Sequence, residues 1–193
     1  YAALKVDVTS AELVGIAGLT ATVTSLSVVV NQTSDTDNPN KVLDFVNTDE
    51  GSNTTDTDAA SREITTGPST DPVTLDMDGD EGALLQVMTD LTLDVFGFVS
   101  LEGSLAFKKA NGSFVVTNGS VSTTLANVDY LEVGGTVATA FAGVGGIGFE
   151  LTGVAFGMLL VSDTKGTTET TDDINYAALK VDVTSAELVG IAG

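Results

Sequence analysis

Apolar residues occupy every second position over much of this 193-residue chain. The first run follows Leu4, Val6 and Val8, and similar alternation appears in residues 19–30 and 91–107, with Thr, Ser, Asp and Glu between the apolar positions. Side chains alternate across a β-strand with a period of two, so this pattern predicts strands. The β-branched residues Val and Thr are frequent throughout, and they favour the same structure.

No stretch of the sequence sustains the i, i+3, i+4, i+7 apolar spacing of an amphipathic helix. The nearest segment is EGALLQVMTDL, residues 81–91, which is long enough for two or three helical turns. Clear alternation continues from its end through Phe107, so we predict a strand there as well. The expected fold class is therefore all-β.

Three stretches share one layout, with a strand pattern on each side of a glycine-containing corner. They read ELVGIAGLTATVTSLSVVV, LDVFGFVSLEGSLAFKK and GVGGIGFELTGVAFGMLLV, and each is followed by a polar loop. Glycine gives the backbone the freedom for a tight reversal or for a sharp bend. A reversal produces antiparallel hairpins and a bend produces solenoid coils, and the sequence leaves both open.

One segment, residues 136–161, is long and apolar enough to raise the alternative of a membrane span, and it contains a GxxxG spacing from Gly153 to Gly157. Glu150 lies in its middle, and the residues around Phe149 and Leu151 alternate with a period of two. We therefore predict a buried pair of strands and no membrane span.

The chain ends as it begins, because residues 176–193 repeat residues 1–18, YAALKVDVTSAELVGIAG, without a substitution. A match of this length indicates a tandem repeat, and we interpret residues 1–175 as one repeat unit and residues 176–193 as the start of the next. The second copy is expected to adopt the conformation of the first and to pack on the strands before it. The first copy then keeps an apolar face and a strand edge uncovered. The predicted joint residues are Leu4, Val6, Val8, Leu179, Val181 and Val183.

The chain carries a formal net charge of −20, from 27 acidic and 7 basic residues. This charge repels nucleic acids and anionic membrane surfaces, whose binding needs Lys or Arg, and it makes cations the natural partners. Cys, His and Trp are missing from the sequence, which excludes disulfides as well as thiolate and imidazole chemistry and leaves oxygen atoms as metal ligands. Calcium prefers oxygen ligands, so it is the cofactor that we expect.

The longest polar region, residues 31–82, holds thirteen acidic residues and is predicted to be a long surface excursion. Within it, the segment DMDGDEG, residues 76–82, places carboxylates at alternate positions beside glycines that let the loop curl, which suits the irregular coordination of calcium. An EF-hand loop does not match at its sixth and twelfth positions, and an acidic turn without an ion is the alternative. The predicted metal ligands are Asp76, Asp78, Asp80 and Glu81, with Asp35 and Asp37 as a second site.

Catalysis is not expected. Paired carboxylates can serve a glycosidase, but sugar clefts usually present aromatic platforms, and the Phe residues here fall in strand alternation that core packing explains. The segment GVGGIG, residues 143–148, does not open a helix, so it does not match a nucleotide-binding loop.

Tandem repetition, polyacidity, the lack of cysteine, strands rich in Thr, Val and Gly, and the D-x-D-G-D loop together resemble the repeat regions of giant secreted bacterial surface proteins of the adhesin and calcium-dependent repeat type. The nonapeptide GGxGxDxUx of calcium-binding β-rolls does not occur, so the roll itself is not implied. The resemblance implies an extracellular or cell-surface location and neighbouring copies of the same repeat as partners. It also implies an ion site at Asp76, Asp78 and Asp80.

Low aromatic content and abundant small residues favour an elongated repeat architecture with acidic loops along one edge, either solenoid-like or built from stacked twisted sheets. An antiparallel β-sandwich is the alternative. We expect a structural repeat unit of an extracellular filament or giant surface protein, propagating head to tail and stabilised by calcium. A passive spacer and a ligand-binding adhesin module are alternatives, although the sequence lacks the aromatic residues of a typical ligand pocket.

Overall fold

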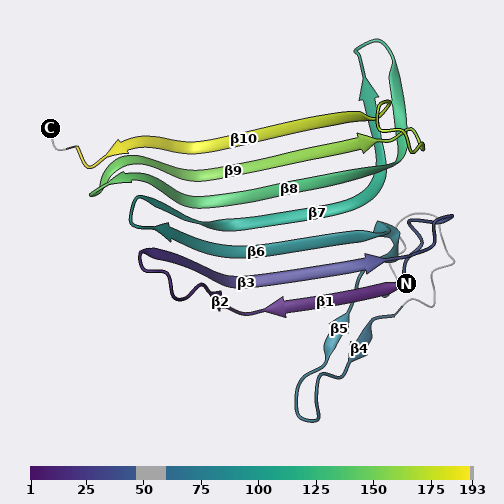
Figure 1. The fold of residues 1–193 in the computed structure, drawn as a ribbon, viewed down its shortest axis with the longest axis horizontal. Helices are drawn as coiled ribbons and strands as arrows, with labels where there is room; N and C mark the ends of the chain where they lie inside the picture. Colours follow the sequence, from purple (N-terminus) through teal and green to yellow (C-terminus); the bar gives the residue numbers. More distant parts are fainter. Residues whose placement is uncertain (47–59, 192–193) are drawn as a thin grey trace.

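The computed structural model describes residues 1–46 and 60–191, and most of its strands form one large antiparallel sheet (Figure 1). The strands of this sheet follow the order β1-β3-β6-β7-β8-β9-β10, and the short β2 pairs with β3 in line with β1, while β4 and β5 form a separate hairpin. The prediction of an all-β fold is confirmed. The bounds are β1 Ala2–Val8, β2 Ala11–Glu12, β3 Leu19–Gln32, β4 Arg62–Ile64, β5 Val73–Leu75, β6 Leu84–Val95, β7 Val99–Thr117, β8 Ser122–Val144, β9 Ile147–Asp163 and β10 Ile174–Val189, with one 3-10 turn at Gly79–Glu81.

All three glycine-containing corners are reversals, at the β2–β3, β6–β7 and β8–β9 connections. Gly145 and Gly146 both have positive φ, 61° and 82°, which is the backbone of the two-residue hairpin turn whose twist matches the flanking strands. The long polar connections lie at the opposite end of the sheet (Figure 1). Hairpins are therefore the outcome at these corners, and the solenoid-like alternative is wrong for the part of the chain that the structure describes.

Residues 136–161 belong to the β8–β9 hairpin, as the alternation predicts. Within the described ranges, no helix is long and apolar enough to cross a membrane. The expectation that this strand pair is buried is wrong, because Val144, Ile147 and Phe149 remain 68%, 52% and 64% exposed. The reason is that none of the described segments forms a second layer over this part of the sheet.

The pairing register divides the strand side chains between two faces, since residues opposite one another in neighbouring strands share a face. Most strand residues on one side are aliphatic or aromatic, with polar exceptions mainly at the end that carries the polar loops, and we call this side the apolar face. The intervening residues form the polar face, which carries Asp7, Asp90, Lys108, Glu132 and Lys180. The apolar face comprises Leu4, Val6, Val8, Leu26, Val28, Val30, Leu85, Val87, Leu105, Phe107, Leu131, Val133, Phe156, Met158, Leu160, Leu179, Val181 and Val183.

The small core lies on the polar face, at the end that carries the polar loops. Leu125, Val128 and Val161 form its centre where the ends of β7 and β8 turn away from the other strands. Beside it, Leu84 and the fully buried Asn31 lie beneath the acidic excursion. The Asn31 side-chain amide donates a hydrogen bond of 2.7 Å to the Leu43 carbonyl, which holds the excursion against the sheet.

The excursion predicted over residues 31–82 is partly regular. Residues 73–75 form β5, which pairs with β4, and residues 79–81 form the 3-10 turn. The backbone N–H of Phe45 bonds to the Met77 carbonyl at 3.0 Å, so the two ends of the excursion contact each other. Residues 47–59 lie outside the described part of the chain.

Candidate functional site: the two edges of the sheet

The two copies of the duplicated segment form opposite edges of the large sheet (Figure 1). The first copy supplies β1 and β2, and the second supplies β10. Strand direction alternates along an antiparallel sheet, and β10 lies six steps from β1, so the two strands point the same way. Both arrows point left in Figure 1.

The first copy pairs with β3 in a single register. Val6 lies opposite Val28 and Ala11 lies opposite Val23, while the Leu13 N–H bonds to the Ala21 carbonyl at 2.9 Å. Regular pairing is interrupted only at residues 9–10, between β1 and β2.

The second copy pairs with β9, the strand that precedes it in the sequence. Leu179 lies opposite Met158 and Val181 lies opposite Phe156. Thr184 falls out of the ladder, and its hydroxyl donates to the Gly153 carbonyl at 3.2 Å. Thr184 is the equivalent of residue 9, so regular pairing is interrupted at the same place in both copies, although β10 continues through it as one strand.

Equivalent residues of the two copies lie on the same face, since Leu4 and Leu179 both belong to the apolar face. The direction of a strand and the face of a residue together fix the side to which its backbone N–H and C=O point. β1 uses the groups directed toward β3, β10 uses those directed toward β9, and no other described strand pairs with the outer edge of either. The edge left open in one copy is therefore the edge that is paired in the other.

The rows of paired residues that start in β1 drift by two positions across the sheet. The row that starts at Val6 in β1 ends at Leu179 in β10, and Leu179 is the equivalent of Leu4. A shift by an odd number would turn the apolar side chains of the second copy to the polar face. The even shift keeps both copies facing the same way.

Lys5 and its equivalent Lys180 have different ion-pair partners. Lys5 Nζ lies 2.8 Å from an Asp76 carboxylate oxygen, and its side chain is 20% exposed. Lys180 pairs with Asp182 of its own strand at 2.8 Å and remains 81% exposed. The contact to the acidic loop, residues 76–82, is thus made at the β1 edge.

Tyr1 and Tyr176 also have different surroundings, but here the second copy makes the contact and the first does not. Tyr176 packs against the core cluster of Leu125, Val128 and Val161, under the ends of β7 and β8. Tyr1 has the same sequence around it but is 60% exposed. Each copy therefore makes one of two available side-chain contacts, the lysine contact in the first and the tyrosine contact in the second.

The acidic loop, predicted as a metal site, is engaged with the protein itself. Asp76 binds Lys5, and Glu81 binds Lys108 at 3.1 Å. The Asp78 side chain caps the 3-10 turn by accepting from the Asp80 N–H at 2.9 Å. These contacts fasten the loop to the polar face, and they do not bring the four carboxylates to one point.

The second predicted metal site forms a local turn. Asp35 accepts bonds from the N–H groups of Asp37 and Asn38 and from the Asn38 side-chain amide, at 3.0, 3.1 and 3.2 Å. The side-chain bond from Asn38 contributes most to a pKa of Asp35 below its ordinary value. No group of three or more acidic residues suited to a metal ion occurs in the ranges 1–46 and 60–191. Calcium binding stays a prediction.

Asp163 stands where β9 leaves the sheet toward β10. It accepts bonds from the Lys165 ammonium and from the Lys165 N–H, the latter at 3.0 Å. The Lys165 side-chain bond, followed by the backbone bond, lowers the pKa of Asp163, and the same pairing raises the pKa of Lys165. This contact orders the start of the connection that leads into the second copy.

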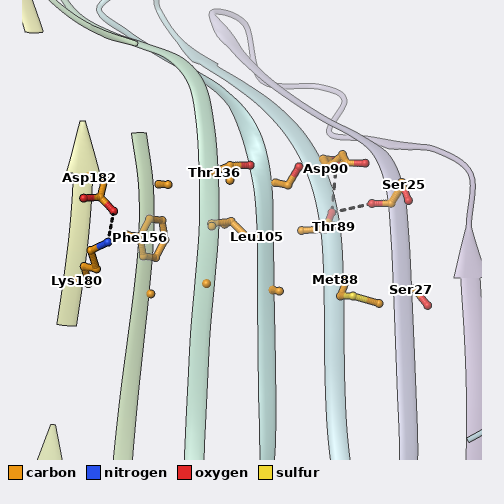
Figure 2. Close-up of a pocket in the computed structure, with 16 residues that line it drawn as sticks. Ser25, Ser27, Met88, Thr89, Asp90, Leu105, Thr136, Phe156, Lys180 and Asp182 are labelled. Atoms are coloured by element: carbon orange, nitrogen blue, oxygen red, sulfur yellow. Dashed lines mark hydrogen bonds and ion pairs between the residues drawn. The ribbon is translucent and has the colours of Figure 1, made fainter. Parts of the chain in front are cut away.

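The polar face holds a shallow trough of about 730 Å³, shown in Figure 2. Its floor is made of small residues such as Ala106, Gly134 and Gly157. Among its polar side chains, Asp90 accepts a bond from Ser104 and Lys180 pairs with Asp182. These polar groups bond to one another along the wall and do not converge on the hollow, so the trough does not resemble a typical ligand site.

The chain matches no family model, and neither a curated protein nor a solved structure matches it. The functional conclusion therefore depends on the geometry of the chain itself. The sequence pattern had singled out the six apolar joint residues. It had not revealed the two side-chain contacts of the copies, because Lys5 and Asp76 are 71 positions apart and only the folded excursion brings them together.

Proposed function

We propose that this chain is a structural repeat unit of an extracellular filament or surface protein, in which one antiparallel sheet continues from each period to the next. The observation that carries the proposal is the placement of the two identical segments at opposite edges of the sheet. They share direction and facing, and they have opposite edges free. One strand of this sequence can therefore pair with β9 of one period and with β3 of the following period at the same time.

The paired rows remain apolar across such a joint. The leucine of the shared strand lies between Met158 on one side and Val30 on the other, and the following valine lies between Phe156 and Val28. Cross-strand contacts between aliphatic and aromatic side chains stabilise antiparallel sheets. Continuation also closes two open strand edges, which are a liability in a soluble protein.

Side-chain contacts support the same arrangement. In a shared strand, the tyrosine packs under the β7–β8 ends of the preceding period, as Tyr176 does, and the lysine binds the acidic loop of the following period, as Lys5 does. The two contacts involve different side chains of the strand and partners in different periods, so they do not compete. Each joint then has both contacts, whereas each edge of the single period has one.

The extracellular setting and calcium are parts of the proposal that rest on the sequence. Each 175-residue period holds 25 acidic and 6 basic residues, so a charge of −19 is repeated with every period, and divalent cations relieve the resulting self-repulsion. The acidic loop is the proposed ion site because its sequence offers four carboxylates near the joint strand, and an ion there competes with Lys5 for Asp76 and with Lys108 for Glu81.

A chain of two periods, residues 1–175 followed by residues 1–193, tests the proposal. Six strands spaced by about 4.8 Å add roughly 29 Å to the width of the sheet. Small-angle scattering and electron microscopy should show one rigid particle that is longer by this amount. Hydrogen exchange should show that amides of the internal copy are protected on both edges of its strand.

The matched control replaces the eighteen internal residues of the two-period chain with a Gly/Ser linker of equal length. It should behave as two sheets that move independently. The proposal is wrong if the unaltered two-period chain gives the scattering profile of this control, or if the internal copy exchanges as fast on one edge as in the single-period chain.

A further inference from the structure

We propose that the apolar face of the sheet binds the apolar face of a second copy of this chain, so that two sheets pack face to face with their polar faces outward. The inference goes beyond the edge-to-edge continuation, and it stands on the single period. It concerns the faces of the sheet, whereas the proposed function concerns its edges.

The apolar face has no cover within the described residues. None of the residues that define it is buried, and Leu4, Phe107 and Leu179 are 49%, 39% and 66% exposed. Val137 of β8, 8% exposed, is the one described side chain on this side that is buried, and the other buried strand side chains lie on the polar face, beneath the excursion and the β7–β8 ends. A soluble protein rarely leaves a contiguous apolar patch larger than about 300–600 Å² in water.

The area of this face fits a stable dimer. Seven strand positions spaced by about 4.8 Å and roughly twelve residues of about 3.3 Å each give a face of roughly 1,300 Å². Two such faces together bury about 2,600 Å², which falls in the range of obligate homodimers. The stacking distance for two such sheets is about 10 Å.

The distribution of charge identifies a second copy as the occupant. Charged residues of the paired strands lie on the polar face, apart from Lys109 and Asp129 at the end with the polar loops. Face-to-face packing leaves the acidic side chains of both copies in water, so the net charge of −20 does not oppose it at short range. The partner surface must be equally wide and equally free of charge, and the apolar face of another copy meets both conditions.

Continuation of the sheet from period to period, which rests on the proposed function, also favours a second copy as the occupant of the apolar face. Every added period extends the apolar face by the same width and composition. A cover with a different period would leave parts of the face exposed, whereas a second sheet of the same repeat matches it along any length. The inferred assembly is then a two-layered sheet.

Sedimentation velocity on the intact 193-residue chain tests the inference. The unaltered chain should sediment as a dimer at micromolar concentration. Leu85→Lys and Phe107→Lys each place a charge on the apolar face. Both side chains are 39% exposed in the single copy, so the charge can reach water there. Each change should weaken the dimer by about 100-fold or more, since burying an unpaired charge is costly.

The matched control is Met88→Lys, on the same strand as Leu85 but on the polar face, with a similar exposure of 43%. It should leave the dimer unchanged. Should Leu85→Lys lose its β-sheet circular dichroism, Leu85→Thr, which suits a strand, tests the same contact and should weaken the dimer by about 10-fold.

Three results overturn the inference. The first is a monomeric unaltered chain. The second is a dimer that survives both apolar-face changes with intact circular dichroism. The third is a monomer that floats with phosphatidylcholine vesicles and loses this binding in Leu85→Lys, which assigns the face to lipid. Each of these leaves the length of the two-period particle unaffected, so failure here is distinguishable from failure of the proposed function.

Discussion

Replacing the same tyrosine in the two copies separates a joint from a free end. In the single-period chain, Tyr176→Ala removes a ring that packs against Leu125, Val128 and Val161. Tyr1→Ala removes an identical ring from an identical sequence, but this ring is 60% exposed. The two variants have the same composition, so any difference between them comes from the environment of the ring.

The expected difference follows from the buried area. An aromatic ring that is fully buried removes about 150–250 Å² from water, which at about 25 cal/mol/Å² stabilises the fold by roughly 4–6 kcal/mol. Tyr176 is partly exposed and the unfolded chain already buries some of this surface, so Tyr176→Ala should cost about 2 kcal/mol. Tyr1→Ala should change the stability by less than about 0.5 kcal/mol.

Thermal unfolding followed by circular dichroism measures the effect. For a chain of this size, about 2 kcal/mol corresponds to a fall in Tm of roughly 4–8 °C for Tyr176→Ala, with almost no change for Tyr1→Ala. In the two-period chain, the tyrosine of the internal copy should behave like Tyr176. Equal effects of the two single-period variants would refute the reasoning, because they would show that the two edges are not distinguished by packing.

Three further outcomes are expected. Asn31→Asp should lower the free energy of unfolding by about 3 kcal/mol or more at pH 7 in urea titrations, because it buries an unpaired carboxylate that faces the Leu43 carbonyl oxygen; no loss would show that the site admits water. The pKa of Asp163 is lowered by Lys165, so its contribution is present above the ordinary value of 3.8 and is lost as the pH falls through the lower folded value. The gap in Tm between the unaltered chain and Asp163→Asn should therefore shrink from pH 5 to pH 2, and a constant gap would contradict it. Calcium should raise the Tm relative to a chelator, and this shift should diminish in Asp78→Asn; coincident melts would show that the acidic loop acts without a bound ion.

Much of the fold follows from the sequence because one local signal dominates it. The period-two alternation places strands correctly in 19–30 and 91–107, and it also decides the ambiguous segment 81–91, where β6 begins at Leu84. The glycine corners predict where the chain changes course. They do not fix the kind of corner, since glycine permits a reversal and a bend alike, and the choice depends on whether the flanking strands pair with each other.

The layers of the fold were harder to predict. Alternation shows that a strand has an apolar face, but it does not show what covers that face. The expected burial of residues 136–161 assumed a second layer, and within the described chain the cover is limited to the polar face at one end. The core at that end depends on Asn31 and on the turned ends of β7 and β8, whose contacts join distant parts of the sequence and have no local signature.

The joint could be predicted from the sequence because an identical segment at both ends indicates a tandem repeat whatever its local structure. Its geometry could not, since three conditions had to hold for the copies to be interchangeable, and the third follows from the first two because the copies form opposite edges of one sheet. An odd number of steps between β1 and β10 would have reversed the second copy, and an odd row shift would have turned Leu179 to the polar face. Pairing of both copies through the same edge would have left no edge for continuation. The chain meets all three conditions, with six steps, a shift of two residues and opposite edges in use. A sheet that ends in a copy of its first strand by chance need not satisfy these conditions together. A sheet that continues through that strand must satisfy every condition.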